Sequence, residues 1–234
     1  MTRIYIDVET VPSQRPGARD LVRSAIRPPG NIKKAETIAA WWENEAPAAI
    51  EEAYRRQALD AAEGELISIA WCADEMDAPS RCIRATDEPE SDLLRVFYLS
   101  LQAYLVTKCV TAPDGQMLWG ADPFFIAHNA AFDLGFLWRR SIVLNCPPPF
   151  ALPAPGAREG RDYGCTMRAW AGPRDTISLD RLCRALCVQS PKGEFDGSKV
   201  FDAWLAGELE AIATYNAADV LATRECWHLL NREV

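Results

Sequence analysis

Hydrophobic and polar residues alternate at the start of the chain, as they do in a β-strand with a buried face. In the stretch RIYIDVE, residues 3–9, isoleucine or valine occupies every second position. This period of two predicts a strand over residues 3–9. The strand ends in two carboxylates, Asp7 and Glu9, which point to the same side because they are two residues apart. Acids are poor strand formers and are costly near a core, so this pair requires a chemical explanation.

The same kind of pattern predicts an α/β layer structure for the rest of the chain. Strand-like runs at 65–74 and 80–86 flank a turn, and together they predict a hairpin beside the first strand. The apolar run at 124–129 predicts another short buried strand. Apolar residues at helical spacing predict the helices. These are expected at 35–62 (interrupted near Pro47), 90–108 (with Ser91 as N-cap), 130–140, 178–187, 198–207 and about 208–231.

Two segments lack a regular pattern. Residues 12–34 are rich in proline, glycine and arginine and predict an irregular loop, and the proline-rich residues 145–162 predict a surface loop. We therefore expect a single domain over residues 1–234, with a loop-helix insertion at about 12–63 and the proline-rich loop at about 145–162.

Composition and cysteine spacing indicate the class of protein. The chain has 234 residues, of which 49% are hydrophobic, enough for a sizeable core. The N-terminus has no apolar signal region, and no stretch approaches the ~18 apolar residues of a membrane span. The eight cysteines are scattered without a C-x-x-C pair, which favours free buried thiols. We expect a soluble, intracellular protein located in the cytoplasm, without a membrane partner.

The net charge of −8 is unusual for a protein that binds nucleic acid, but its distribution matters more than its sum. The whole acidic excess lies within residues 61–136, and cations balance acids in the other two parts of the chain. A locally basic groove can therefore form outside the acidic part.

Two further acids occupy positions that resemble those of Asp7 and Glu9. Asp133 follows a buried strand in HNAAFD, and Asp219 lies in the last predicted helix, four residues after Tyr215 and on the same helix face. That face is otherwise apolar, so its acid must be paired, neutralised or bound to a metal. Four converging carboxylates would repel one another strongly, and divalent cations remove that repulsion.

The residue types favour particular metals and a particular reaction. Oxygen ligands, in a chain with only two histidines, select Mg²⁺ or Mn²⁺ rather than zinc. Two such cations about 3.5–4 Å apart can stabilise the attacking and leaving oxygens of an in-line phosphoryl displacement. The acids therefore predict a two-cation site for phosphoryl chemistry.

Three motifs, taken in order, resemble those of the DEDDy (DnaQ-like) 3′–5′ exonucleases. They are IDVET with Asp7 and Glu9, HNAAFD with Asn129, Phe132 and Asp133, and YNAAD with Tyr215 and Asp219. Residues 176–231 are also similar to the stand-alone exonucleases related to the proofreading domain of family B DNA polymerases. The resemblance covers residues 3–10, 64–72, 124–138 and 176–231.

The resemblance implies a fold and a reaction. The fold is the ribonuclease H-like one, a mixed five-stranded sheet with an antiparallel second strand, flanked by helices. The reaction is metal-dependent removal of nucleoside 5′-monophosphates from the 3′ ends of single-stranded DNA, with two Mg²⁺ or Mn²⁺ ions as cofactors.

The resemblance also implies roles for five residues. Asp7 would bridge both ions, Glu9 and Asp219 would complete the shell of the ion that holds the attacking water, and Asp133 would hold the second ion through water. Tyr215 would position that water, since its ordinary pKa near 10 makes it a poor base at neutral pH.

Neighbours of these motifs, together with two lysines that flank a polar loop between predicted helices, are candidates for contact with the substrate, a single-stranded 3′ end. Stacking on aromatic side chains and contacts to phosphates would hold such an end. The candidates are Thr10, Val11, Asn129, Phe132, Lys192 and Lys199. A polymerase or another replication or repair protein, acting in trans, is a second expected partner.

Three alternatives remain open at this point. The first is a 3′–5′ exoribonuclease of the same superfamily, since only the 2′-hydroxyl separates the two substrates. The second is a ribonuclease H-like module that binds nucleic acid without catalysis. The third is a metal-free structural α/β protein, for which the inward-facing acids would be a heavy energetic cost.

Overall fold

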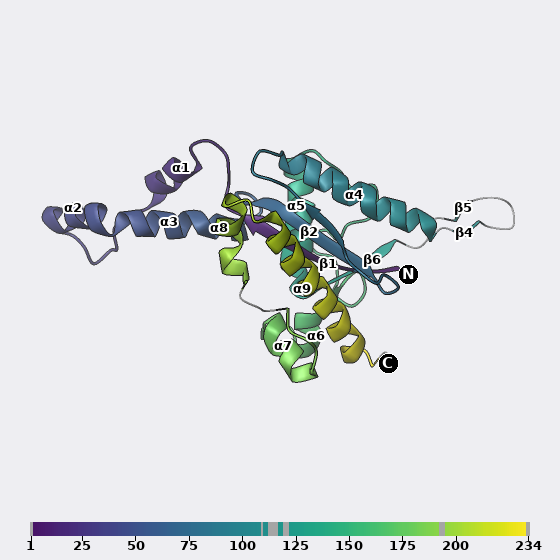
Figure 1. Ribbon diagram of the computed structural model, residues 1–234. Coiled ribbons are helices and arrows are strands. Elements are labelled where there is room, and N and C mark those ends of the chain that lie inside the picture. Colours follow the sequence, from purple (N-terminus) through teal and green to yellow (C-terminus); the bar gives the residue numbers. More distant parts are fainter. Residues whose placement is uncertain (1, 109, 112–116, 119–121, 192–194, 233–234) are drawn as a thin grey trace. The chain divides into compact units, whose positions relative to one another are not determined.

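The computed structural model describes residues 2–108, 110–111, 117–118, 122–191 and 195–232 (Figure 1). The chain forms two compact units. The first comprises Met1–Glu9 together with Leu66–Val234, and the second comprises Thr10–Glu65. Within the described residues, no helix is both long enough and apolar enough to cross a membrane.

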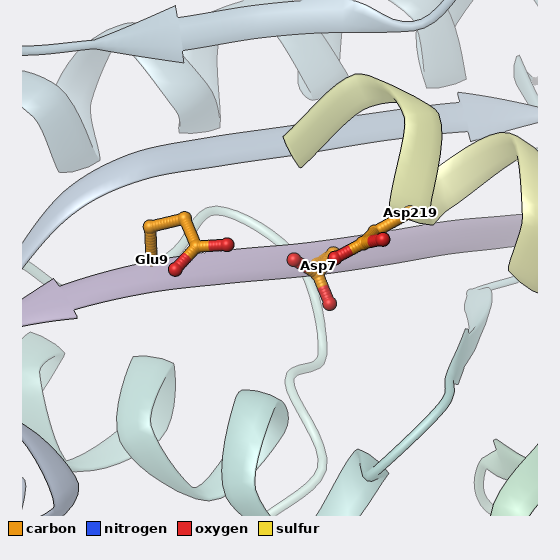
Figure 2. A group of neighbouring side chains, drawn as sticks. All are labelled: Asp7, Glu9 and Asp219. Atoms are coloured by element: carbon orange, nitrogen blue, oxygen red, sulfur yellow. The ribbon is translucent and has the colours of Figure 1, made fainter. Parts of the chain in front are cut away.

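A five-stranded sheet forms the centre of the first unit. Its order is β3 (Ser80–Ile83), β2 (Glu65–Ala73), β1 (Thr2–Val11), β6 (Pro123–Ala127) and β7 (Gly164–Cys165). The β1–β6 and β6–β7 pairs are parallel, and β2–β3 is antiparallel. In Figure 2 the arrow of β2 runs opposite to that of β1. The predicted mixed ribonuclease H-like sheet is thus confirmed.

Helices cover the sheet and connect its strands. The long helix α9 (Leu209–Leu230) packs on one face, where Val220 joins a buried cluster with Tyr5, Phe124 and Ile126. Phe125 has the opposite orientation in its strand and contacts Phe150, a residue of the proline-rich loop. The other helices of this unit are α4 (Glu90–Thr107), α5 (Ala130–Val143), α6 (Thr166–Ala171), α7 (Leu179–Leu186) and α8 (Val200–Leu205), with the short 3₁₀ helix η2 (Gly197–Lys199).

Several details of the first unit differ from the sequence-based expectations. Helix α4 has Pro89 as its N-cap residue, and Ser91 is already inside the helix. Strand β7, helix α6 and the small antiparallel pair β4 (Val110–Thr111) and β5 (Met117–Leu118) were not predicted. The described cysteines are free thiols, as predicted, although Cys187 is exposed rather than buried.

The second unit consists of short helices. They are α1 (Ala18–Ala25), α2 (Ala35–Asn44), α3 (Ala46–Arg56) and the 3₁₀ helix η1 (Gln57–Leu59). The prediction of an irregular loop at 12–34 was wrong over α1. Pro47 lies in the first turn of α3, where its missing N–H is not needed, so the helical run breaks just before it, at Glu45.

Candidate active site

Strand β1 and helix α9 bring three carboxylates together. Asp7 and Glu9 lie two residues apart on β1, and Asp219 lies on α9 with 8% of its surface exposed. One carboxylate oxygen from each residue lies within 4.8 Å of the others (Figure 2). Residues separated by more than two hundred positions in the sequence therefore form one acidic cluster, which has the spacing needed to share a metal ion.

The fourth predicted acid, Asp133, lies beside this cluster but not within it. It is in the first turn of α5 and is 3% exposed. Its Oδ1 accepts a hydrogen bond from the backbone N–H of Val8 at 3.3 Å, so α5 and β1 are joined between the two strand acids. Asp133 is near enough to raise the pKa values of both Asp7 and Glu9.

Burial and mutual repulsion raise the pKa values of these acids. Burial is the largest cause for Asp7, followed by the charges of Asp133, Asp219 and Glu9. Burial is again the largest cause for Glu9, followed by Asp219 and Asp133. The pKa of Asp133 is raised to about 7 by burial, and its hydrogen bond from Val8 opposes that rise. The cluster therefore holds more negative charge than its surroundings stabilise, and protons or cations would relieve it.

A neutral side chain that was not predicted, Asn216, orients Asp7. Its Nδ2 donates to Asp7 Oδ2 at 2.6 Å, and its Oδ1 accepts from the Ser68 hydroxyl at 2.9 Å. Both Asn216 and Ser68 are fully buried. One feature of the sequence indicated this role, the spacing of Asn216 and Asp219, which are three residues apart and therefore share a face of α9.

Tyr215 faces the same acids. Burial is the main cause that raises the pKa of its hydroxyl above the ordinary value, followed by the charges of Asp219, Glu9 and Asp7. Its ring lies 5.3 Å from that of Phe195, measured between centroids. Tyr215 therefore stays protonated at neutral pH and can donate a hydrogen bond.

Tyr215 and Asp219 line a pocket of about 330 Å³. The other walls come from His128, Asn129, Met167, residues 177–180 and Pro191. A pocket of this size next to the acidic cluster has room for a small polar group such as a sugar phosphate.

His128 lines this pocket but is held in place by its neighbours. Its Nε2 lies 2.9 Å from the carbonyl oxygen of Ile177, and its Nδ1 lies 2.9 Å from the hydroxyl of Thr166. A carbonyl only accepts, so Nε2 carries the proton, and in the neutral ring Nδ1 accepts from Thr166. Burial lowers the pKa of His128, which favours this neutral form. With both nitrogens engaged, His128 fixes the pocket wall and is not available as a base.

The predicted substrate contacts have varied environments. The Thr10 hydroxyl donates to the carbonyl of Ala58 at 2.6 Å, and Val11 is fully buried. Asn129 is exposed at the pocket, and the half-buried Phe132 packs against Phe136 with ring centroids 5.4 Å apart.

The structure describes one of the two lysines that were predicted to contact the substrate. Lys199 is exposed in η2, and Lys192 lies outside the described residues. All six substrate contacts stay predictions.

Comparison with known protein families gives a match in the C-terminal part of the chain. Residues 165–230 match the model of a family described as predicted 3′-5′ exonuclease related to the exonuclease domain of PolB. No curated protein matches the chain. The matched residues contain α6 to α9, and so include Tyr215 and Asp219. The resemblance to stand-alone exonucleases related to family B polymerases is thereby confirmed, and the match supports 3′–5′ exonuclease activity for this chain.

Proposed function

We propose that the protein is a DEDDy-type exonuclease that removes nucleoside 5′-monophosphates from the 3′ ends of single-stranded DNA, with two divalent cations. The proposal rests on one observation above all, the convergence of oxygens from Asp7, Glu9 and Asp219 within 4.8 Å of one another. Asp133, hydrogen-bonded to Val8 beside this cluster, is the fourth acid.

The residues present fit Mg²⁺ or Mn²⁺. The donor set consists of carboxylate oxygens, which these hard cations prefer, and His128, which lines the pocket, is engaged with Thr166 and Ile177. The raised pKa values of Asp7 and Glu9 indicate a shortage of positive charge at this point. When bound, two cations would neutralise the acids and stabilise the charge that develops on the phosphate oxygens.

The protein side chains have separate tasks in this proposal. Asp7, the residue nearest the centre of the cluster in Figure 2, would contact both cations, and Asn216 would hold its carboxylate in one orientation. Glu9 and Asp219 would bind one cation, and Asp133 would bind the other through water. Tyr215 would donate a hydrogen bond that orients the attacking water beside the scissile phosphate, because its raised pKa keeps the proton on its hydroxyl.

The pocket would hold the terminal nucleotide. Asn129, which lines the pocket, and Phe132, one turn along α5, would contact the sugar or base of that nucleotide. Thr10 and Val11, which directly follow Glu9 in the sequence, are further candidates for this contact. Lys192 and Lys199 would contact phosphates further along the strand. A polymerase or repair protein that leaves mismatched 3′ ends would supply the substrate in trans.

The direct test is degradation of an oligonucleotide labelled at its 5′ end. With Mg²⁺ or Mn²⁺, single-stranded DNA should shorten from its 3′ end in one-nucleotide steps, and EDTA should stop the reaction. Asp7→Ala should abolish the activity while the protein stays folded. Asp175→Ala, which removes an exposed carboxylate outside the cluster, is the matched control and should retain full activity.

Three outcomes would contradict parts of the proposal. Faster shortening of RNA than of DNA would assign the exoribonuclease activity instead. Binding without shortening of either strand would assign a non-catalytic module. Activity that persists in Asp7→Ala would remove Asp7 from the mechanism.

A further inference from the structure

Positive charge is concentrated in one segment of the second unit, residues 15–34, which we name the basic segment. It contains six cations and a single acid, Asp20, in a protein whose net charge is −8. The following residues, 35–63, have the reverse composition, with seven acids and two cations. The unit is close to neutral as a whole, but its charges are segregated along the sequence.

The cations of the basic segment differ from those of α3 in their partners. On α3, Arg55 pairs with Glu51 and Arg56 pairs with Glu52. In the basic segment, Arg15, Arg23, Lys33 and Lys34 are exposed, and among the described residues none of them has a carboxylate within 4.0 Å. Four cations are therefore available to an external anion.

The basic segment is attached to a folded scaffold and is not a free tail. Arg19 forms an ion pair with Glu51, and its guanidinium lies over the Tyr54 ring, 4.2 Å from the centroid. The Tyr54 hydroxyl donates to the carbonyl of Ser13 at 2.8 Å, which fixes the chain just before the segment. Arg23 lies one helical turn beyond Arg19 on α1.

Arginine and lysine without acidic partners, on a fixed scaffold, suit an extended polyanion. We propose that the basic segment binds the phosphate backbone of the nucleic acid whose 3′ end enters the active site. The inference rests on the proposed function for the identity of the ligand. Glu9 and Thr10 are consecutive residues of β1, so the unit that holds the basic segment is covalently continuous with the strand of the active-site acids. Such contacts read phosphates and not bases, so DNA and RNA should both bind.

The test measures binding without cleavage. Fluorescence anisotropy in EDTA, with labelled oligo(dT) and oligo(rU), would compare the wild-type protein with the double variant Arg15→Gln/Arg23→Gln over a range of salt concentrations. The matched control is Arg174→Gln/Arg232→Gln, which removes the same charge from exposed arginines of the first unit.

Loss of two phosphate contacts should make the negative slope of log K against log salt shallower by roughly 1.4, and it should weaken binding by about tenfold or more at 0.1 M salt. The control variant should bind like the wild type. An unchanged affinity and slope in the double variant would overturn the inference, as would equal losses in the control. If the double variant loses binding to phosphatidylserine vesicles but keeps its binding to oligonucleotides, the inference is also overturned, and the basic segment is assigned to a membrane surface instead.

The same samples separate this inference from the proposed function. If no strand shortens with Mg²⁺ or Mn²⁺ but the double variant still loses affinity, the exonuclease proposal fails, and the proposal that the basic segment binds nucleic acid is upheld. If strands shorten normally and the double variant binds like the wild type, the proposal that the basic segment binds nucleic acid fails, and the exonuclease proposal is upheld.

Discussion

At the scale of single residues, the acidic cluster depends on a neutral amide. Asn216 links Ser68 of β2 to Asp7 of β1, and each of its two hydrogen bonds uses a different atom of the amide. The Asp7 carboxylate fixes which end of the amide faces it, because an ionised carboxylate only accepts and needs the Nδ2 donor, which leaves Oδ1 to accept from the Ser68 hydroxyl. Second-layer groups of this kind orient metal ligands and tune their affinity.

Replacement of Asn216 by alanine should therefore weaken cation binding. We expect Mn²⁺ affinity to fall about 10- to 100-fold, the usual cost of losing an outer partner of a metal ligand. Isothermal titration with Mn²⁺ measures this without any nuclease assay. The control is Asn231→Ala at the end of the same helix. Among the described hydrogen bonds, the Asn231 amide donates only to the backbone carbonyl of Trp227. Equal affinities for the two variants would contradict a role in orienting Asp7.

Tyr215 permits a prediction that separates orientation from metal binding. Tyr215→Phe removes the hydroxyl but keeps the ring that packs near Phe195. The cleavage rate should fall by about 100-fold, the effect expected when a reacting group is misplaced by about 1 Å. Mn²⁺ affinity should stay at the wild-type value. Because burial and the nearby acids raise the pKa of Tyr215, the rate of the wild-type protein should show no step from tyrosine ionisation between pH 7 and about pH 9.

Sequence reasoning identified some of the candidate site and missed the rest for a physical reason. Asp7, Glu9 and Asp219 were recognisable because acids at a strand end and on an apolar helix face conflict with their local surroundings. Asn216 and His128 conflict with nothing local, since amides and imidazoles are common in helices and at strand ends. Their importance comes from partners far away in the sequence, such as Asp7 for Asn216 and Ile177 for His128.

At the scale of elements, a buried ion pair joins two helices and the sheet. Arg140 of α5 donates to both carboxylate oxygens of Glu90 on α4, at 2.9 and 2.5 Å. Glu90 Oε1 also accepts from the backbone N–H of Leu66 in β2, at 2.8 Å. Both side chains are almost completely buried, so each charge depends on the other.

Removal of Arg140 should consequently be costly. Arg140→Ala leaves the Glu90 carboxylate buried without its cation, and we expect the free energy of unfolding to fall by about 3–5 kcal/mol. Urea denaturation measures the loss. The adjacent Arg139 is exposed, and Arg139→Ala should change the stability by no more than about 0.5 kcal/mol. A loss of similar size in both variants would mean that α5 is weakened for reasons other than the ion pair.

The elements also show where patterns along a sequence lose their predictive value. Strand β1 and helix α9 are long enough for a period to be read, and both were predicted close to their observed bounds. Strand β7 has two residues, too few for any alternation, and it exists because β6 offers a parallel partner. Helix α1 lies in a segment with many helix-breaking residues, and contacts of Arg19 with α3 stabilise it.

At the scale of the whole molecule, the acidic cluster links stability to pH and metal. Asp7, Glu9 and Asp133 have higher pKa values in the folded protein than in the unfolded chain. A folded state that binds protons more tightly than the unfolded state loses stability as pH rises, from the unfolded pKa values near 4 up to the folded ones. For Asp133 that window closes at about pH 7.

The metal-free protein should therefore become less stable between pH 5.5 and pH 8. Asp133 alone should contribute about 2 kcal/mol to this loss, which corresponds to a fall in Tm of about 5 °C for a protein of this size. Differential scanning calorimetry in EDTA measures the trend. Mn²⁺ should raise Tm more at pH 8 than at pH 5.5, because the cation replaces protons that the acids have already lost.

The variant Asp133→Asn sharpens this prediction, because it keeps the shape of the side chain and removes its charge. In EDTA its Tm should fall less between pH 5.5 and pH 8 than that of the wild type, and at pH 8 the metal-free variant should be the more stable of the two. Asp175→Asn, an exposed acid outside the cluster, should follow the wild-type curve. If the metal-free wild type instead gained stability toward pH 8, the acids would be held by cationic partners in the folded protein, and the cluster would have no need of a metal.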